Sequence, residues 1–127
     1  MERLLGSPID RLVDAMRFRL SRQAALAANV ANADTPGYRR VDVEFHDVLQ
    51  RAASEVRRTH ARHLATAENS GIRVVHGPRG SRPDGNGVDR DREVLELSRN
   101  AGAFNDQASI LARVIALRRI AATGESG

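Results

Sequence analysis

The fold depends most on residues 22–38, RQAALAANVANADTPGY, where a helical pattern ends in a turn. The first part is rich in Ala, which favours helix, and its small side chains let another helix approach closely. The pattern stops near Asn32, because Pro36 disfavours helix at the residue before it. Pro36 and Gly37 fit the two central positions of a type II turn, in which Gly37 supplies a positive φ. The sequence therefore predicts a helix that ends here and a turn that follows it.

Upstream of this stretch, the sequence predicts a helical arm over residues 7–33. Ser7 is a typical helix cap, Pro8 suits the first helical position, and Asp10 lies in the first turn, where an acid suits unpaired N–H groups. Such a helix of about 24 residues would be roughly 36 Å long. Apolar residues three or four apart line one side of it, as expected of a packing surface. This N-terminal stripe consists of Ile9, Val13, Met16, Leu20, Ala24, Ala27 and Ala31.

A second helical arm is predicted over residues 89–123. Acids gather at its start, where the helix dipole favours them, and Gly124 ends it. Steps of three and four residues alternate over about four heptads, broken only at Arg118, which is typical of a supercoiling helix. This C-terminal stripe consists of Val94, Leu97, Ala101, Phe104, Ala108, Leu111 and Ile115. A second row, Ile110, Val114, Leu117 and Ala121, makes the apolar face wider than one partner helix would cover.

The middle segment, residues 34–88, is irregular with weak β character. Val41, Val43 and Phe45 alternate with acids, as in a strand with one buried face, and a second strand is predicted around residues 72–75. The spacing of Phe45, Val48, Leu49, Ala52 and Val56 also fits a short amphipathic helix, so the boundary between strand and helix stays open. Most of residues 57–92 is predicted to be loop, rich in Arg, Gly and Pro.

We therefore expect one mainly α domain over residues 1–127, in which the two long terminal helices form a coiled-coil-like helical hairpin or act as assembly arms. Only four of the 127 residues are aromatic, so a core made from this chain would be thin and partners would add stability. The net charge of +4 comes from interleaved Arg and acids, and there is no Cys. We find no secretory signal and no long apolar run, and expect a protein without a cleaved signal peptide.

No motif predicts catalysis, a cofactor or a metal. His60 and His63 are spaced as two metal ligands on a helix could be, but no third ligand accompanies them, so we interpret them as solvated. Residues 84–89 begin like a calcium loop, yet Val88 and Leu95 stand where oxygen ligands are required. No Ser, His and acid set suggests a nucleophile, and we expect no enzyme.

Residues 22–38 resemble the N-terminal signature of the flagellar rod and hook protein family, in which an Asn-Ile-Ala-Asn element precedes a Thr-Pro-Gly-Tyr turn. The matching positions are Asn29, Asn32, Thr35, Pro36, Gly37 and Tyr38, with Val30 as the one conservative departure. Residues 40–45, 59–64 and 84–89 resemble members of this family from the proximal rod. The C-terminal arm, with Asn100 in its second turn, resembles the closing helix of the family.

The resemblance implies a structural subunit of the flagellar basal-body rod, which self-assembles through its terminal helices and transmits torque for motility. It implies other rod proteins, a FliE-type adaptor and membrane-ring components as partners. It also implies export by the flagellar type III apparatus and a place in the periplasmic space. The alternative is a small Arg-rich helical protein that binds nucleic acid, although acids interrupt its arginines and aromatic residues for stacking are scarce. That alternative rests on Arg39, Arg40, Arg51, Arg57, Arg58 and Arg62.

Overall fold

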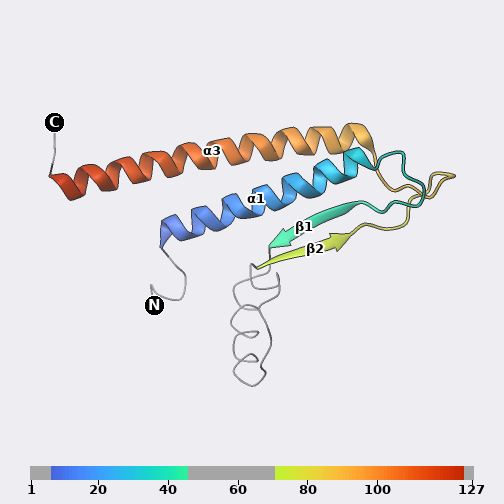
Figure 1. The fold of residues 1–127 in the computed structure, drawn as a ribbon, viewed down its shortest axis with the longest axis horizontal. Coiled ribbons are helices and arrows are strands. Elements are labelled where there is room, and N and C mark those ends of the chain that lie inside the picture. Colours follow the sequence, from blue (N-terminus) through green and yellow to red (C-terminus); the bar gives the residue numbers. More distant parts are fainter. Residues whose placement is uncertain (1–6, 46–70, 125–127) are drawn as a thin grey trace, which may run out of the picture.

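The computed structural model describes residues 7–45 and 71–124 and has two long helices and two short strands (Figure 1). In chain order these are helix α1 (Pro8–Ala31), strand β1 (Val41–Phe45), strand β2 (Ile72–His76) and helix α3 (Arg90–Thr123). The predicted mainly α fold, with long terminal helices and a short β segment between them, is confirmed. Neither helix has a stretch long and apolar enough to cross a membrane within these described ranges.

Capping groups fix both ends of each helix. At the start of α1, Ser7 and Asp10 form a capping box in which each side chain accepts a hydrogen bond from the other's backbone N–H, at 3.2 and 2.9 Å. The side chain of Asp89 accepts a hydrogen bond from the N–H of Arg92 at the start of α3. Gly124 closes α3 with a φ of +67°, a conformation that Gly adopts at low cost. The predicted helix boundaries are confirmed within a few residues.

The two helices pack against each other as an antiparallel hairpin, which is one of the two arrangements that the sequence left open (Figure 1). Hydrogen bonds join Arg22 to Glu96 and Asn29 to Glu93. A residue later in α1 is thus bonded to a residue earlier in α3, as in antiparallel helices. The C-terminal end of α1 therefore lies beside the N-terminal end of α3. Because α3 has 34 residues and α1 has 24, the last ten residues of α3 extend past the start of α1.

The two strands form an antiparallel ribbon that lies along α1. Val43 is opposite Val74 and Phe45 is opposite Ile72, which confirms both predicted strands. The ring of Phe18 on α1 stacks on that of Phe45, with centroids 4.9 Å apart. Phe45 ends β1, and the remaining residues of the proposed amphipathic helix, Val48, Leu49, Ala52 and Val56, lie outside the described residues, as do His60 and His63.

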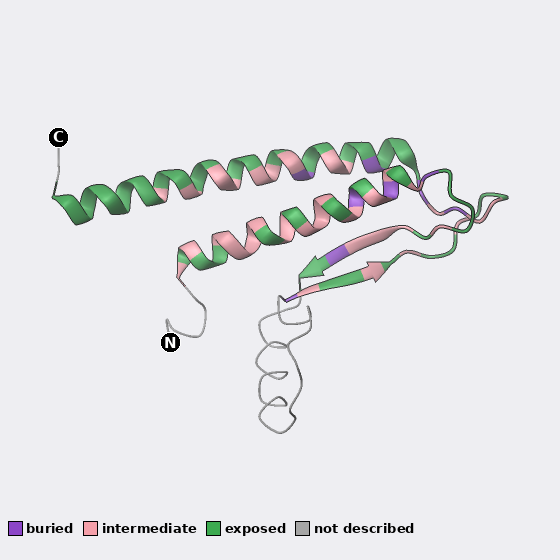
Figure 2. Ribbon diagram, viewed as in Figure 1, coloured by how far each residue is buried: buried purple, intermediate pink, exposed green. Residues whose placement is uncertain are grey.

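The core is thin and half polar (Figure 2). Its buried apolar residues in the described part of the chain are Leu26, Ala33, Val43 and Val88. Its buried polar residues there are Asn29, Asn86, Glu93 and Asn100, each at most 1% exposed. A pair of helices and a ribbon cannot enclose many large side chains, so hydrogen bonds between buried polar groups carry much of the specificity of this fold.

Candidate assembly site

The turn after α1 has the geometry that its sequence predicts. Gly37 has a φ of +71°, and the N–H of Tyr38 donates to the carbonyl of Thr35 across the turn at 3.3 Å. The N–H of Gly37 also donates to the carbonyl of Asp84 at 2.8 Å, which joins the turn to the loop before α3. Nothing lies within 4 Å of a Cβ built on Gly37, so its backbone conformation, and not a lack of space, is what requires Gly.

Asn86 locks the turn to the start of α3. Its side-chain N–H group donates to the carbonyls of Asn32 and Thr35, at 2.9 and 2.7 Å, and its side-chain oxygen accepts from the N–H of Val88 at 2.8 Å. Asn32 itself donates to the carbonyl of Ala28 at 2.8 Å and accepts from the hydroxyl of Thr35 at 3.1 Å. The side chains of Asn32 and Thr35 therefore shape the turn itself, and Asn86, through their backbone carbonyls, holds the turn to a loop that is far away in sequence.

Asn29 is fully buried and connects α1 to β1 and α3. Its side-chain oxygen accepts from the N–H of Val41 at 2.9 Å and from the hydroxyl of Tyr38 at 3.2 Å. Its side-chain N–H group donates to the carbonyl of Val41 at 2.7 Å and to the carboxylate of Glu93 at 3.1 Å. All four hydrogen-bonding positions of this amide are thus used, which explains why the motif requires Asn at this position.

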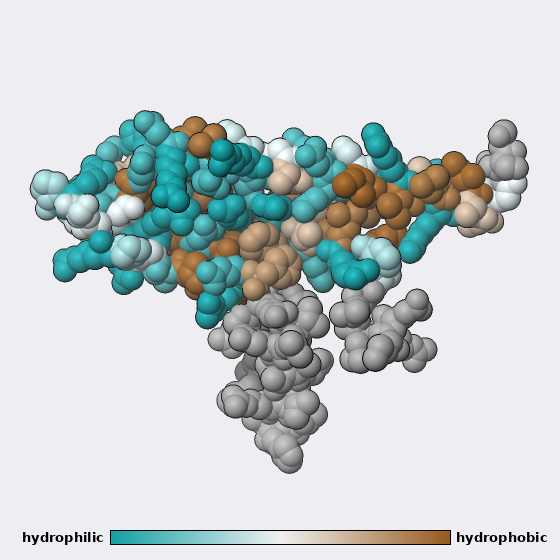
Figure 3. Space-filling view, turned by 180° about the vertical axis from the view of Figure 1, so that it is seen from behind, coloured by the Kyte–Doolittle hydropathy of each residue, from teal (hydrophilic) through white to brown (hydrophobic). Residues whose placement is uncertain are grey.

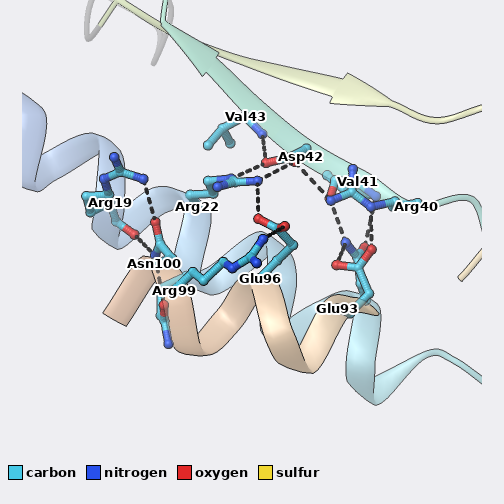
Figure 4. A network of polar contacts seen from close by, with 12 residues as sticks. Arg19, Arg22, Arg40, Val41, Asp42, Val43, Glu93, Glu96, Arg99 and Asn100 are labelled. Atoms are coloured by element: carbon cyan, nitrogen blue, oxygen red, sulfur yellow. Dashed lines mark hydrogen bonds and ion pairs between the residues drawn. The ribbon is translucent and has the colours of Figure 1, made fainter. Parts of the chain in front are cut away.

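Ion pairs extend this arrangement along the groove between the helices and β1 (Figure 4). Glu93 accepts from Arg40, which also donates to Asp42 at 3.0 Å. Arg22 donates to Asp42 at 3.0 Å and to Glu96 at 3.3 Å. These five residues, Arg22, Arg40, Asp42, Glu93 and Glu96, are called the charged network below. Because its acids and arginines already bind one another, a cavity of about 310 Å³ beside them offers no set of like charges to a ligand.

The charged network shifts the pKa values of three of its members, Arg22, Arg40 and Asp42. Partial burial acts to raise the pKa of Asp42, but hydrogen bonds from Arg22, the N–H of Val43 and Arg40 outweigh it and hold that pKa below its usual value. The hydrogen bond to Asp42 is the main cause that raises the pKa of Arg22. For Arg40, burial acts to lower the pKa, and its bonds to Glu93 and Asp42 reverse the effect and raise it. Arg22, Arg40 and Asp42 are therefore charged throughout the neutral pH range.

Asn100, in the first third of α3, joins that helix to the middle of α1. Its side chain donates to the carbonyl of Arg19 and to the side-chain oxygen of Gln23, both at 2.8 Å. Asn100 and Glu93 were not among the site residues expected from the apolar stripes. Their signal in the sequence is their spacing, since Glu93, Asn100 and Gln107 follow one another every seven residues along α3. Polar residues at one heptad position are known to fix the register of paired helices.

The two stripes lie beside the line of contact between the helices. In the N-terminal stripe, Ile9, Val13 and Met16 are half-buried, while Leu20, Ala24, Ala27 and Ala31 are exposed. In the C-terminal stripe, Leu97, Ala101, Phe104, Ala108 and Leu111 are half-buried, while Val94 and Ile115 are exposed. The positions one residue earlier, Glu93 and Asn100, are the buried ones. Both stripes therefore keep apolar surface that contacts with other chains could cover.

Four of the nine large apolar side chains that are exposed in the described part of the chain lie on the second half of α3. Leu117 is 67% exposed, and Ile110, Ile115 and Ile120 are each about half exposed at 51%, 52% and 49%. Figure 3 shows this hydrophobic surface gathered toward the C-terminal end of the helix. An apolar surface of this extent on a subunit is typical of an interaction site.

The arginines behind the nucleic-acid alternative are only partly described. Arg40 belongs to the charged network, and Arg39 donates to the carbonyl of Gly77 at 2.8 Å. Arg51, Arg57, Arg58 and Arg62 lie outside the described residues. The two described arginines are thus engaged within the fold, and no observation favours this alternative.

Comparisons with known proteins agree with the motif geometry. A family model described as "Flagella basal body rod protein" matches residues 9–39, which hold most of α1 and the turn. The flagellar basal body rod protein FlgB of Yersinia ruckeri is 34% identical over 126 residues, covering 81% of this chain and 89% of that protein. FlgB of Salmonella typhimurium is 35% identical and that of Escherichia coli 33%, each covering 81% of this chain and 88% of its own length. A chain that shares this motif and aligns over most of its length with these relatives belongs to the FlgB family of flagellar basal body rod proteins.

Proposed function

We propose that this chain is a structural, non-enzymatic subunit of the proximal rod of the flagellar basal body, which assembles through α1 and α3 and transmits torque. The observation that carries this proposal is the exposed apolar surface of α3, in a member of a rod-protein family. Covering a side chain such as Leu117 would contribute about 1.5–3 kcal/mol. Repeated at every subunit, such contacts would add to the stability that the thin core gives to a single chain.

The internal hydrogen bonds suit a part that carries mechanical load. Asn29, Asn86 and Asn100 each join segments that are distant in sequence, so α1, α3 and β1 move as one unit. Contacts with neighbours that do not close on themselves generate a helical tube, and the next protein in line limits its growth. Other rod proteins, a FliE-type adaptor and membrane-ring components are the expected neighbours, in the periplasmic space after type III export.

The direct test is imaging of basal bodies in situ, by electron cryotomography of cells with and without this chain. We expect cells without it to lack a complete rod and to be non-motile, and expression of the chain to restore both. An unchanged rod in the deletion strain would refute the proposal.

A pair of glycine substitutions tests whether the turn matters to assembly. Gly37→Val forces a β-branched residue into a positive φ, whereas Gly102→Val changes a helical glycine, and neither Cβ would have an atom within 4 Å. The added volume is the same, so any difference between the variants reflects backbone conformation. We expect Gly37→Val to impair rod assembly and swimming and Gly102→Val to leave both near normal. Equal swimming by the two strains would argue against a role for the turn.

A further inference from the structure

Asn86 is the only Asn in the chain that is followed by Gly. In an open chain, the backbone nitrogen of the residue after an Asn can attack the side-chain amide of that Asn. A Gly in this position hinders the attack least, because it has no Cβ and the most mobile backbone. The other Asn residues all precede residues that carry a side chain. Asn86 is therefore the Asn of this chain that is most prone to deamidation when the chain is open.

Deamidation at this site consumes only water. The backbone nitrogen of Gly87 attacks Cγ of Asn86, and the new C–N bond closes a cyclic imide. The bond from Cγ to the side-chain nitrogen breaks, and this nitrogen leaves as ammonia with the proton that Gly87 has lost. Water then opens the imide at either of its carbonyl groups and leaves Asp or isoaspartate at position 86. No atom is oxidised or reduced.

The closed fold holds both nitrogens that take part in the reaction. The N–H of Gly87 donates to the carbonyl of Tyr38 at 3.0 Å, so the attacking nitrogen keeps its proton. The side-chain nitrogen of Asn86 donates to the carbonyls of Asn32 and Thr35, at 2.9 and 2.7 Å. Both of its hydrogens are thus held by carbonyl oxygens, which cannot supply the proton that ammonia needs. Asn86 is also only 1% exposed, so the closed fold keeps water from its amide.

One hydrogen bond acts in the opposite direction. The N–H of Val88 donates to the side-chain oxygen of Asn86 at 2.8 Å and would stabilise negative charge on that oxygen during the attack. This bond neither releases the N–H of Gly87 from Tyr38 nor supplies a proton to the leaving nitrogen. The turn must therefore open before the reaction can proceed.

We propose that Asn86 and Gly87 form a deamidation site that the closed fold protects and that opening of the turn exposes. The product cannot restore the closed state. A carboxylate at position 86 has no N–H to donate and would set negative oxygen against the carbonyls of Asn32 and Thr35. Isoaspartate also lengthens the backbone before Gly87. Chains that stay open are therefore converted into chains that cannot fold, a property that goes beyond the proposed function and does not depend on it.

The first test compares deamidation of the full-length chain in folding buffer and in urea, at the same mildly alkaline pH and temperature. Mass spectrometry follows the tryptic peptide of residues 80–90, which contains no other Asn. In buffer only the open fraction reacts. We therefore expect deamidation to be at least about tenfold slower there than in urea, equivalent to an opening free energy of about 1.4 kcal/mol. A synthetic peptide of the same residues corrects for effects of urea on the chemistry, and equal corrected rates would overturn the inference.

Variants test the protecting contacts and the attacking group. A Cβ on Gly80 would collide with the backbone of Asn86 and Gly87, so Gly80→Ala should speed deamidation in buffer about fivefold or more. Gly102→Ala is the matched control, because its Cβ has open space and the rate should stay as in the unchanged chain. Equal rates in the two variants would overturn the protective role of the turn. In urea, Gly87→Ala should deamidate more slowly than the unchanged chain, and an unchanged rate would overturn attack by this nitrogen.

The fate of the product is tested by refolding. The chain is converted to about half in urea, returned to folding buffer and treated briefly with a protease that digests open chains. We expect the modified peptide to be depleted at least about tenfold in the chains that survive, because two buried hydrogen bonds are lost. Asn86→Asp reproduces one product and should be digested as fast as the modified chains. An equal share of modified peptide before and after digestion would overturn the claim that the product cannot fold.

Discussion

Replacing Asn29 by Ala removes the side chain that connects three segments of the fold. Its amide makes four hydrogen bonds, two of them with the backbone of Val41 and one each with Tyr38 and Glu93. The residue is 0% exposed, so water cannot replace these bonds without opening the structure. The substitution leaves the N–H and carbonyl of Val41 without these partners, and Glu93 keeps only its bond to Arg40.

The expected cost follows from these groups. A typical hydrogen bond contributes about 1 kcal/mol, and a buried group left unpaired costs about 1–3 kcal/mol. Ala is the better helix former by a few tenths of a kcal/mol, which offsets little of this. We expect Asn29→Ala to lower the free energy of unfolding by about 3–5 kcal/mol. Since small domains are stable by about 5–15 kcal/mol, this loss should leave the fold marginal at best.

The assay is urea unfolding followed by circular dichroism, on the chain at a concentration where it does not associate. Asn105→Ala is the matched control, an exposed Asn-to-Ala change on α3, and should alter the free energy of unfolding by less than about 0.5 kcal/mol. A value for Asn29→Ala within about 1 kcal/mol of the unchanged chain would refute the reasoning, because the four bonds would then contribute little.

Three further substitutions test other parts of the fold. Gly80→Ala should destabilise by about 1–3 kcal/mol in urea unfolding, because its Cβ would lie 1.9 Å from the carbonyl oxygen of Asn86, whereas Gly102→Ala has open space and should be neutral or stabilising. The pKa of Asp42 is lowered in the folded state, so its stabilising effect is present above its unfolded pKa of about 3.9 and is lost as the pH falls through the folded value. Unfolding curves between neutral pH and about pH 3 should therefore show less acid destabilisation for Asp42→Asn than for the unchanged chain, and identical pH profiles would contradict this. Ser7→Ala should lower the free energy of unfolding by about 1 kcal/mol, measured by thermal or urea unfolding. An unchanged free energy of unfolding would mean that the capping box does not stabilise the fold.

Local sequence rules predicted the element boundaries well. Ser7 and Pro8 start a helix, Gly124 ends one and Pro36-Gly37 makes a turn, because each of these residues has a strong backbone preference of its own. Alternation around Val43 predicted a strand for a similar reason. These signals depend on a few neighbouring residues, so they can be found without knowing what the segment packs against.

The line of contact between the helices was harder to predict. Periodicity favours the most apolar row, which on α3 begins at Val94, but the buried positions include Glu93 and Asn100, one residue before Val94 and Ala101. A buried polar residue is favourable only when its partner is in place, and Asn29 and Gln23 are distant in sequence. Hydropathy therefore could not identify these positions. A seven-residue spacing of polar residues would have been the better guide.

The polar interior of the helical hairpin has a consequence for temperature. Cooling weakens hydrophobic contacts. It weakens hydrogen bonds between buried amides and carboxylates much less. In this chain the amides of Asn29 and Asn100 lie inside the subunit, and side chains such as Leu117 lie on its outside. Cooling should therefore weaken the contacts between neighbouring subunits before it unfolds any subunit. A rod built from such subunits would then dissociate in the cold into folded subunits.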